Sequence, residues 1–360
     1  MLAHDTTRTS STTGQGDWVE EPVGQRHMDP LVAAHLNPAL RGRDLLTDTD
    51  LTPGEILDVM HSAAVLKRLR KDRVPHAWLA GKTLGLIFQH PSTRTRTALQ
   101  AAMEQLGGQA IFLGLDDLQL RRGETIGDTA AVFSRYVEGI AVRVEHREDM
   151  FELAAGASVP VLNGLTSFDH PIEALSDVFT LRERFGSLAG LRFAYLGDGN
   201  NVCHSLLLSC SAVGISVTCA GPEAYRPDPE VVATAQRLAS AAGATVTLTD
   251  DPVVAVDGAD AVYTDVHESM GETVNPGKLM ALAPFRVTRK LMAQAKAEAV
   301  FMHCLPLHRG QEVESEVADG PQSIIFDQAE NRLHVHKAVL LQVLHDERLG
   351  LAGRESPESE

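Results

Sequence analysis

The sequence predicts an α/β protein of two domains, each with a mostly parallel β-sheet flanked by helices, and a ligand-binding cleft between the domains. Two observations support this fold class. With 360 residues, the chain exceeds the usual size of a single hydrophobic core. Short apolar runs also alternate with helical patterns along most of the chain, which is typical of parallel sheets with helices on both faces.

The elements of the first domain follow from this alternation. A capped helix is predicted near 52–69, with Pro53 in its first turn. The predicted strands lie near 83–88, 109–113, 139–144 and 159–162. The helices that separate them are predicted near 94–106, 124–137 and 146–155.

A long helix predicted at 171–185 is expected to cross to the second domain, where the alternation resumes. The strands of this domain are predicted near 191–196, 215–219, 243–247, 260–264 and 298–302. Its helices are predicted near 201–213, 229–241 and 328–346.

Composition excludes several classes of protein. A mean hydropathy of -0.07 and the lack of an apolar run near 18 residues argue against a membrane span. The net charge of -16 argues against nucleic-acid binding without a basic patch. The basic run at 67–71 is interpreted as the solvated last turn of a helix.

The cysteines and the amino terminus indicate a cytoplasmic protein. The four cysteines show neither CxxC spacing nor a disulfide framework, which suits a reducing compartment and argues against a zinc site. The amino terminus lacks the features of a signal or transit peptide. Residues 1–28 have too little apolar surface to pack, so we expect a mobile tail there.

The most informative segment is the turn before the predicted helix at 94–106. Its polar residues are Ser92, Thr93, Arg94, Thr95 and Arg96. Backbone amides and the positive end of a helix dipole favour an anion at such a position, and hydroxyl and guanidinium donors strengthen that preference. The segment therefore indicates a phosphate site. The alternative left open is a capping box followed by solvated arginines, since Ser and Thr are favoured N-caps.

Two polar side chains stand out next to predicted strands. Arg143 falls in an otherwise apolar strand, so it requires either a structural carboxylate or an anionic ligand. His170 comes directly before Pro171 at the start of the long helix, where a ring N–H can polarise a carbonyl oxygen. A lone histidine is more often structural, so this interpretation depends on its neighbours.

Two loops in the second half carry candidate binding groups. The turn at Gly197 has only the first two glycines of a dinucleotide fingerprint, so we interpret it as a polar turn whose Asn200 and Asn201 contact a small ligand. After a later strand, Asp265 can pair with an ammonium group, and Ser269 with the backbone after it can contact a carboxylate. The alternative is an Asp that only forms a turn.

The last two candidates are Cys304 and Arg332. Cys304 ends a predicted strand and is either an inert small hydrophobe or a thiol facing the cleft. Its neighbour His303 is expected to point to the opposite face, which argues against a nucleophilic Cys–His pair. Arg332 is predicted in the first turn of the last helix, where a cation opposes the dipole unless an anion lies nearby.

In order, and over roughly residues 40–345, these segments resemble the aspartate/ornithine carbamoyltransferases. The ornithine branch is the closer match, because the aspartate-specific relatives typically carry Pro where this chain has Cys304 and lack its 269–271 loop. The resemblance implies transfer of the carbamoyl group of carbamoyl phosphate to the side-chain amine of ornithine. The products would be citrulline and phosphate, as in arginine biosynthesis.

The resemblance also implies roles for individual residues. The catalytic residues would be Arg143, His170, Cys304 and Arg332. The residues that bind carbamoyl phosphate would be Ser92, Thr93, Arg94, Thr95, Arg143, His170, Glu173, Cys304, Leu305 and Arg332. The residues that bind the amino acid would be Asn201, Asp265, Ser269 and Met270.

Members of this family use no metal or organic cofactor, and their catalytic unit is a trimer, so we expect no cofactor and a homotrimer or an assembly of trimers. The expected partners are two small substrates, carbamoyl phosphate and an amino-acid amine, and neither nucleic acid nor a membrane. The carbamoyl phosphate domain is expected at 29–166, joined by a C-terminal helix at 335–350, and the amino-acid domain at 167–334.

Several positions depart from the usual ornithine pattern. Gln89 and His90 replace Glu-Lys, Ser167 replaces Asp or Asn, Glu173 replaces a Gln that contacts the carbamoyl group, and His267 replaces a Trp. Glu173 is expected to repel a phosphate dianion, and so to reduce affinity for carbamoyl phosphate, unless it is protonated or paired. His267 is expected to reshape the wall beside the acceptor.

These departures leave alternatives open. The acceptor can be another diamino acid or a diamine in a specialised pathway: lysine, 2,3-diaminopropionate, 2,4-diaminobutyrate or putrescine. A non-catalytic carbamoyl phosphate-binding homologue is a second alternative, which the intact polar residues disfavour. A nicotinamide oxidoreductase is disfavoured because the turn at Gly197 lacks the third glycine.

Overall fold

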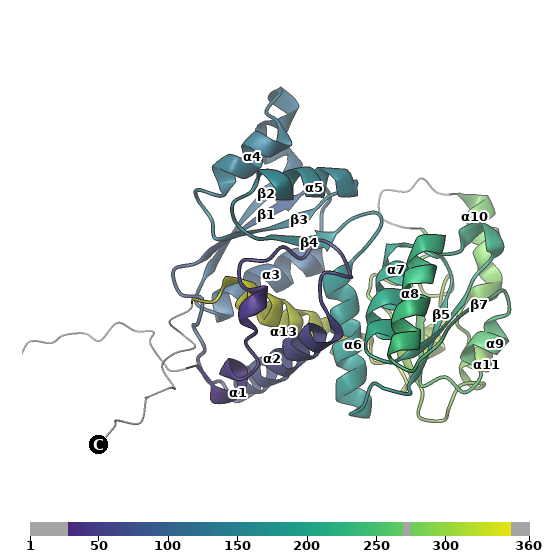
Figure 1. The fold of residues 1–360 in the computed structure, drawn as a ribbon. Helices are drawn as coiled ribbons and strands as arrows, with labels where there is room; N and C mark the ends of the chain where they lie inside the picture. Colours follow the sequence, from purple (N-terminus) through teal and green to yellow (C-terminus); the bar gives the residue numbers. More distant parts are fainter. Residues whose placement is uncertain (1–27, 269–274, 347–360) are drawn as a thin grey trace, which may run out of the picture.

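The computed structural model describes residues 28–268 and 275–346 (Figure 1). The tail predicted for residues 1–28 lies almost entirely outside these ranges, and so do Ser269 and Met270. Met28, the last residue of that predicted tail, is buried in the apolar core. In the described parts of the chain, no helix combines the length and apolar character needed to cross a bilayer.

The first domain contains a parallel four-stranded sheet in the order β2-β1-β3-β4. Its strands are β1 Thr83–Phe88, β2 Gln109–Gly114, β3 Gly139–Arg143 and β4 Val161–Leu165. Every residue of β3 is buried, as expected for the interior strand of a sheet covered on both faces. The predicted strand at 159–162 begins and ends later, because the polar Asn163 is buried in β4 and bonded to Asp169.

Helices cover both faces of this sheet. Figure 1 shows α4 and α5 on one face, and α2, α3 and α13 on the other. Thr52 and Glu55 form a capping box at the start of α2. The helices are α1 Pro30–Ala33, α2 Pro53–Lys71, α3 Thr93–Gln105, α4 Ile126–Phe133, α5 Arg147–Gly156 and α13 Ile325–Leu344, with 3-10 turns at Pro38–Leu40, Leu115–Asp117 and Gln119–Arg122.

The second domain contains a parallel five-stranded sheet in the order β7-β6-β5-β8-β9. Its strands are β5 Arg192–Leu196, β6 Ser216–Ala220, β7 Val246–Thr249, β8 Ala261–Thr264 and β9 Val300–Met302. In Figure 1, α7 and α8 cover one face, and α9 to α11 cover the other. The helices are α7 Asn201–Ala212, α8 Pro229–Ala241, α9 Pro252–Val256, α10 Pro276–Leu282, α11 Arg289–Met292 and α12 Ser315–Ala318, with 3-10 turns at Glu223–Tyr225 and Ala283–Phe285.

Two long helices join the domains. Helix α6, Pro171–Phe185, has the predicted bounds and packs against α2, α7 and α13. Helix α13 begins at Ile325, three residues before the predicted start, because Gln328 N already donates to Ile324 O. The prediction that Arg332 lies in the first turn is therefore wrong. Arg332 lies about two turns inside the helix, so the dipole argument does not apply to it.

The connections bring the ligand-binding edges of the two sheets together. The strand order reverses between β1 and β3 in the first sheet, and between β5 and β8 in the second. Open α/β sheets bind ligands beyond the carboxyl ends of their strands at such points. The loop at Ser92 follows β1, Arg143 ends β3, and Asp265 follows β8.

Candidate active site

The segments that follow these strands line one cavity of about 1080 Å³ between the domains. This cavity gathers residues as far apart in the chain as Ser92 and Arg332. Among the residues selected from the sequence, those that line it are Ser92, Thr93, Arg94, Thr95, Arg143, His170, Glu173, Asn200, Asn201, Asp265, Cys304, Leu305 and Arg332, together with His90 and Ser167.

The start of α3 forms one wall of the cavity. Ser92 is the N-cap, and its side-chain oxygen accepts from Thr95 N at 3.3 Å. Ser92 thus caps the helix through one side-chain bond, and the other amides of the first turn stay available to an anion. Arg94 crosses the cleft and donates to Leu305 O at 2.5 Å.

Arg96 does not belong to this wall, although the sequence grouped it with the turn. Its guanidinium lies 3.6 Å from the centre of the Phe112 ring, outside the cavity lining. Residues two apart on a helix do not share a face, so Arg94 and Arg96 point in different directions.

Arg143 is 4% exposed and lies at the carboxyl end of β3, where its side chain reaches the cavity. Burial, together with the charge of Arg332, lowers the pKa of Arg143 to about 10. The guanidinium therefore stays charged at neutral pH. Arg94 and Arg332 line the cavity together with Arg143, and Arg226 is a fourth arginine in its lining, so the cavity is attractive to an anion.

Glu173 lies between the Arg332 guanidinium and the His170 ring. Its Oε2 is 3.1 Å from Arg332 Nε and 3.2 Å from His170 Nε2, and all three side chains are buried. Burial raises the pKa of Glu173, but Arg332 and His170 outweigh it and hold the pKa below its usual value. Glu173 is thus charged but paired. Pairing is one of the two conditions, beside protonation, under which Glu173 is not expected to repel a phosphate dianion.

Both the backbone N–H and the ring of His170 contact other residues. It is the N-cap residue of α6, and its N donates to Ser205 Oγ at 2.8 Å. Ser205 Oγ in turn donates to Asp48 Oδ2 at 2.8 Å. Burial lowers the pKa of His170, although the hydrogen bond to Glu173 acts in the opposite direction. Ser205 and Asp48 carry no motif in the sequence, so their support of His170 was not predicted.

The segment after β9 forms the opposite wall. Cys304 Sγ donates to Asp265 Oδ1 at 3.2 Å. Burial and the carboxylates of Asp265 and Glu173 raise the pKa of the Cys304 thiol well above its usual value, so the thiol stays protonated. A protonated thiol is a weak nucleophile, which agrees with a role other than covalent catalysis.

The prediction that His303 and Cys304 point to opposite faces of a strand is wrong. Strand β9 ends at Met302, so strand alternation does not apply to them. One donor atom of each lies within 4.8 Å of the other and of an Asp265 oxygen.

The second domain supplies the polar groups expected at the acceptor end. Asn200 donates to Asp265 Oδ2 at 2.7 Å, while Asn201 donates to Thr166 O at 2.7 Å. Lys278 lies in the same wall, 2.8 Å from an Asp198 oxygen. No sequence pattern indicated Lys278, because it lies on the short helix α10.

The other departures from the family pattern have local explanations. His90 Nε2 lies 2.9 Å from Glu145 Oε2, and both side chains line the cavity. Ser167 Oγ donates to Glu145 O at 2.6 Å. His267 is fully buried and is not part of the lining, although its neighbours Val266 and Glu268 are, so its effect on the wall beside the acceptor stays a prediction.

Two groups of side chains in the described ranges have the donor types of a metal site. The first is Asp265 and Cys304 in the cavity wall, with His303 behind them. Its donors are engaged elsewhere: the thiol proton binds Asp265, and His303 Nδ1 accepts from Leu305 N at 2.9 Å. A cation would have to replace these bonds.

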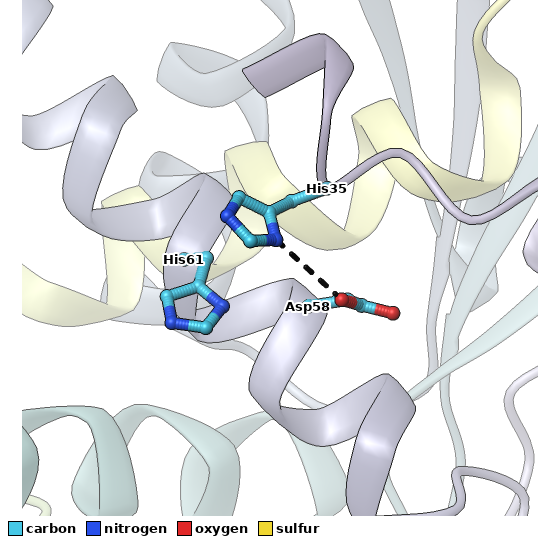
Figure 2. Close-up of side chains that lie close together, drawn as sticks. All are labelled: His35, Asp58 and His61. Atoms are coloured by element: carbon cyan, nitrogen blue, oxygen red, sulfur yellow. Dashed lines mark ion pairs between the residues drawn. The ribbon is translucent and has the colours of Figure 1, made fainter. Parts of the chain in front are cut away.

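The second group is His35, Asp58 and His61, on α2 and just after α1 (Figure 2). His35 Nδ1 lies 3.7 Å from Asp58 Oδ1, and the histidine rings stack at 4.2 Å. Arg182 Nη2 lies 2.6 Å from His61 Nε2. A guanidinium can only donate, so Nε2 accepts and neutral His61 carries its proton on Nδ1. His61 therefore has no free lone pair for a cation, and Arg182 adds a repelling charge.

The sequence matches two family models that together span most of the chain. Residues 43–183 match the carbamoyl-P binding domain of aspartate/ornithine carbamoyltransferase, and residues 189–343 match its Asp/Orn binding domain. The boundary between these matches falls just after α6, the helix that joins the two sheets.

Whole-chain relatives agree with these matches. The chain is 48% identical over 313 residues to an ornithine carbamoyltransferase of Pyrococcus horikoshii, covering 87% of this chain and 99% of the relative. It is 46% identical over 308 residues to that of Bacillus subtilis, covering 85% and 95%. The solved ornithine carbamoyltransferase of Pyrococcus furiosus superposes with a TM-score of 0.83 at 49% identity, covering 85% of this chain and 98% of that one. The chain therefore belongs to the aspartate/ornithine carbamoyltransferase family.

Proposed function

We propose that this chain transfers the carbamoyl group of carbamoyl phosphate to the side-chain amine of L-ornithine, releasing L-citrulline and phosphate. The observation that carries the proposal is the convergence of Arg94, Arg143, His170 and Arg332 on one interdomain cavity. The ornithine carbamoyltransferases at 46% to 48% identity support the choice of acceptor.

The phosphate binds at the start of α3. The backbone amides and hydroxyls of Ser92, Thr93 and Thr95 donate to its oxygens, and Arg94 adds a charged donor. Arg332 already donates to Thr95 Oγ1 at 2.7 Å, so its guanidinium lies within reach of the same anion. The helix dipole and the arginines hold the phosphate both as substrate and as leaving group.

The carbamoyl group lies between Arg143, His170 and the Cys304–Leu305 segment. The neutral amine attacks the carbonyl carbon, the new C–N bond forms, and the C–O bond to phosphate breaks. Arg143 and His170 stabilise the negative charge that develops on the carbonyl oxygen. The Leu305 carbonyl and Glu173 Oε1 accept from the carbamoyl nitrogen. The fixed positions of both substrates supply the remaining rate enhancement.

The acceptor binds against the second domain. Asp265 pairs with its α-ammonium group, beside Asn201. Ser269 and Met270 complete this end in the proposal, although both lie outside the described residues. Of the departures considered, His90, Ser167 and Glu173 line the cavity, and His267 does not. The choice of ornithine over a different diamino acid or diamine rests on the ornithine carbamoyltransferases that the chain resembles.

The proposal extends to domains, assembly and location. Residues 29–166 with the C-terminal helix form the carbamoyl phosphate domain, and residues 167–334 form the amino-acid domain. The chain works as a homotrimer or an assembly of trimers, without a cofactor. The four cysteines are free thiols, which suits the cytoplasm.

An acceptor panel tests this proposal. Phosphate release and ureido product are measured with ornithine, lysine, 2,4-diaminobutyrate, 2,3-diaminopropionate and putrescine. Ornithine is expected to give the highest kcat/KM, with phosphate release that depends on the amine. A different best acceptor would replace ornithine in the proposal, and release without any acceptor dependence would favour the non-catalytic alternative.

Arg94 and Arg96 offer a matched pair of variants. They have the same side chain on the same helix turn, but only Arg94 lines the cavity. We expect Arg94→Ala to lower kcat/KM for carbamoyl phosphate by roughly 100-fold, since it removes a charged donor to the phosphate. Arg96→Ala is expected to change it by less than about 10-fold. Equal losses in both variants would contradict the placement of the phosphate.

A further inference from the structure

The segment that carries Cys304 and Leu305 passes the cavity in an uncommon backbone conformation. Leu305 has a φ of 61°, in the left-handed region that residues other than glycine rarely adopt. Its carbonyl oxygen accepts from Arg94 at 2.5 Å. The direction of this carbonyl in the cavity therefore depends on whatever holds the Leu305 backbone in place.

The His303 ring provides that support from behind the cavity. Leu305 N donates to His303 Nδ1 at 2.9 Å. Because Nδ1 accepts, neutral His303 must carry its proton on Nε2. Nε2 lies 3.4 Å from Glu312 Oε1, and both side chains are fully buried. Neither His303 nor Glu312 lines the cavity.

Glu312 is itself fixed in place. His308 N donates to Glu312 Oε1, and Val287 N donates to the Glu312 carbonyl oxygen at 2.9 Å. Burial raises the pKa of Glu312, but its contacts with His303 and His308 outweigh burial and hold the pKa below its usual value. Glu312 is therefore a charged acceptor facing the His303 nitrogen that carries the proton.

We propose that Glu312 is a positioning residue for the carbamoyl site. It holds His303 in the tautomer and ring orientation in which Nδ1 accepts from Leu305 N, and so directs the Leu305 carbonyl towards the carbamoyl group. The identity of that group rests on the proposed function. The chain of contacts from Glu312 through His303 to Leu305 and Arg94 does not.

Loss of the Glu312 carboxylate would leave the His303 ring without its acceptor. A buried Nε2–H without an acceptor is costly, and a ring flip that relieves it places a carbon against Leu305 N. Leu305 then loses a bond that offsets its left-handed conformation. An Asn at position 303 avoids this dependence, because its side-chain oxygen can accept from the N–H two residues later, as in an Asx turn.

The test compares Glu312→Ala, Glu312→Gln, His303→Asn and the double variant Glu312→Ala/His303→Asn. Glu312→Ala is expected to lower kcat/KM for carbamoyl phosphate by roughly 10- to 100-fold. Glu312→Gln is expected to stay within about 3-fold, because its amide oxygen keeps the contact at Oε1. In the His303→Asn background, adding Glu312→Ala is expected to lower kcat/KM by less than about a further 3-fold.

Binding measurements separate this proposal from the proposed function. In calorimetric titrations, Glu312→Ala is expected to weaken carbamoyl phosphate but not inorganic phosphate, which does not reach the Leu305 carbonyl. This difference is measurable even if no amine accepts the carbamoyl group. If Glu312→Ala does not fold, His303→Phe removes both ring nitrogens but keeps an aromatic ring, and it is expected to show the same selective loss.

Three results would overturn the proposal. One is an unchanged kcat/KM in a folded Glu312→Ala variant. Another is equal impairment of Glu312→Ala and Glu312→Gln. The third is the same loss from Glu312→Ala in the wild-type and His303→Asn backgrounds, because Glu312 would then not act through the His303 ring.

Discussion

Replacing Glu173 by Gln should tighten the binding of carbamoyl phosphate and destabilise the unliganded chain. Glu173 Oε2 lies 3.1 Å from Arg332 Nε and 3.2 Å from His170 Nε2. The carboxylate therefore neutralises charge that a phosphate dianion would otherwise use. Gln keeps the volume and an acceptor oxygen, so the substitution removes the charge and little else.

The contact distance sets the scale of the effect. Two unit charges about 3 Å apart interact by about 5 kcal/mol at an effective dielectric constant near 20, before the cost of removing both from water. Charge-assisted hydrogen bonds keep a net value of about 1.5 to 3 kcal/mol. Without the Glu173 carboxylate, Arg332 has lost that charged partner in the unliganded chain. The phosphate dianion supplies a new charged partner for Arg332 when it binds. Affinity should therefore rise by roughly 10- to 100-fold, while the free energy of unfolding falls by about 1.5 to 3 kcal/mol.

Calorimetric titration with carbamoyl phosphate measures the affinity, and urea unfolding with and without inorganic phosphate measures the stability. Glu145→Gln is the matched control, because Glu145 lines the same cavity but pairs with His90 in a more exposed position. The control should change affinity by less than about 5-fold. Weaker binding in Glu173→Gln, with unchanged stability, would refute the reasoning.

Arg143, the ornithine amine and Lys337 each provide a further test. Arg143→Ala should lower kcat by roughly 100- to 1,000-fold in steady-state assays, because it removes a donor to the developing oxyanion; a loss below about 10-fold would contradict that role. The rate with ornithine should rise with pH above neutrality, because the attacking amine must be neutral, and a flat profile while the amine titrates would count against the mechanism. Burial lowers the pKa of Lys337, which contacts His76 Nε2, from 10.5 to about 7. Between the two pKa values, the unfolded chain therefore binds a proton that the folded chain lacks. The free energy of unfolding of the wild type, relative to that of Lys337→Met, should therefore rise by about 2 kcal/mol from pH 7 to 9 in urea unfolding. A difference that stays constant with pH would show that Lys337 stays charged.

Most of the fold could be predicted from local patterns. The interior strand β3 shows why, since its residues are buried on both faces and read as one apolar run around Arg143. Helix α6 was predicted with the bounds it has because Pro171 and Gly186 flank it clearly. Four-residue helices such as α11 were missed, because a single turn has no periodicity to detect.

Site residues could be predicted where the residue type alone indicates the chemistry. They could not be predicted where contacts between distant segments of the chain determine the position of the side chain. Arg143 was identified because an arginine in an apolar strand requires a partner, and Arg94 because it lies in a polar turn at the start of a helix. Arg332 was selected on a first-turn argument that the start of α13 contradicts. Arg96 was grouped with Arg94 wrongly, since its stacking on Phe112 depends on a strand that pairs with β1. The support of His170 by Ser205 could not be predicted, because the two residues meet only when α7 packs beside α6.

The measurement that most directly tests the central claim is a crystal structure of this chain with carbamoyl phosphate or a non-hydrolysable phosphonate analogue. We predict that the phosphate lies within hydrogen-bond distance of the 92–95 loop, and that the carbamoyl oxygen lies beside Arg143 and His170. Density for the ligand away from this loop, with these side chains unmoved and not in contact with it, would contradict the claim that they form one carbamoyl phosphate site.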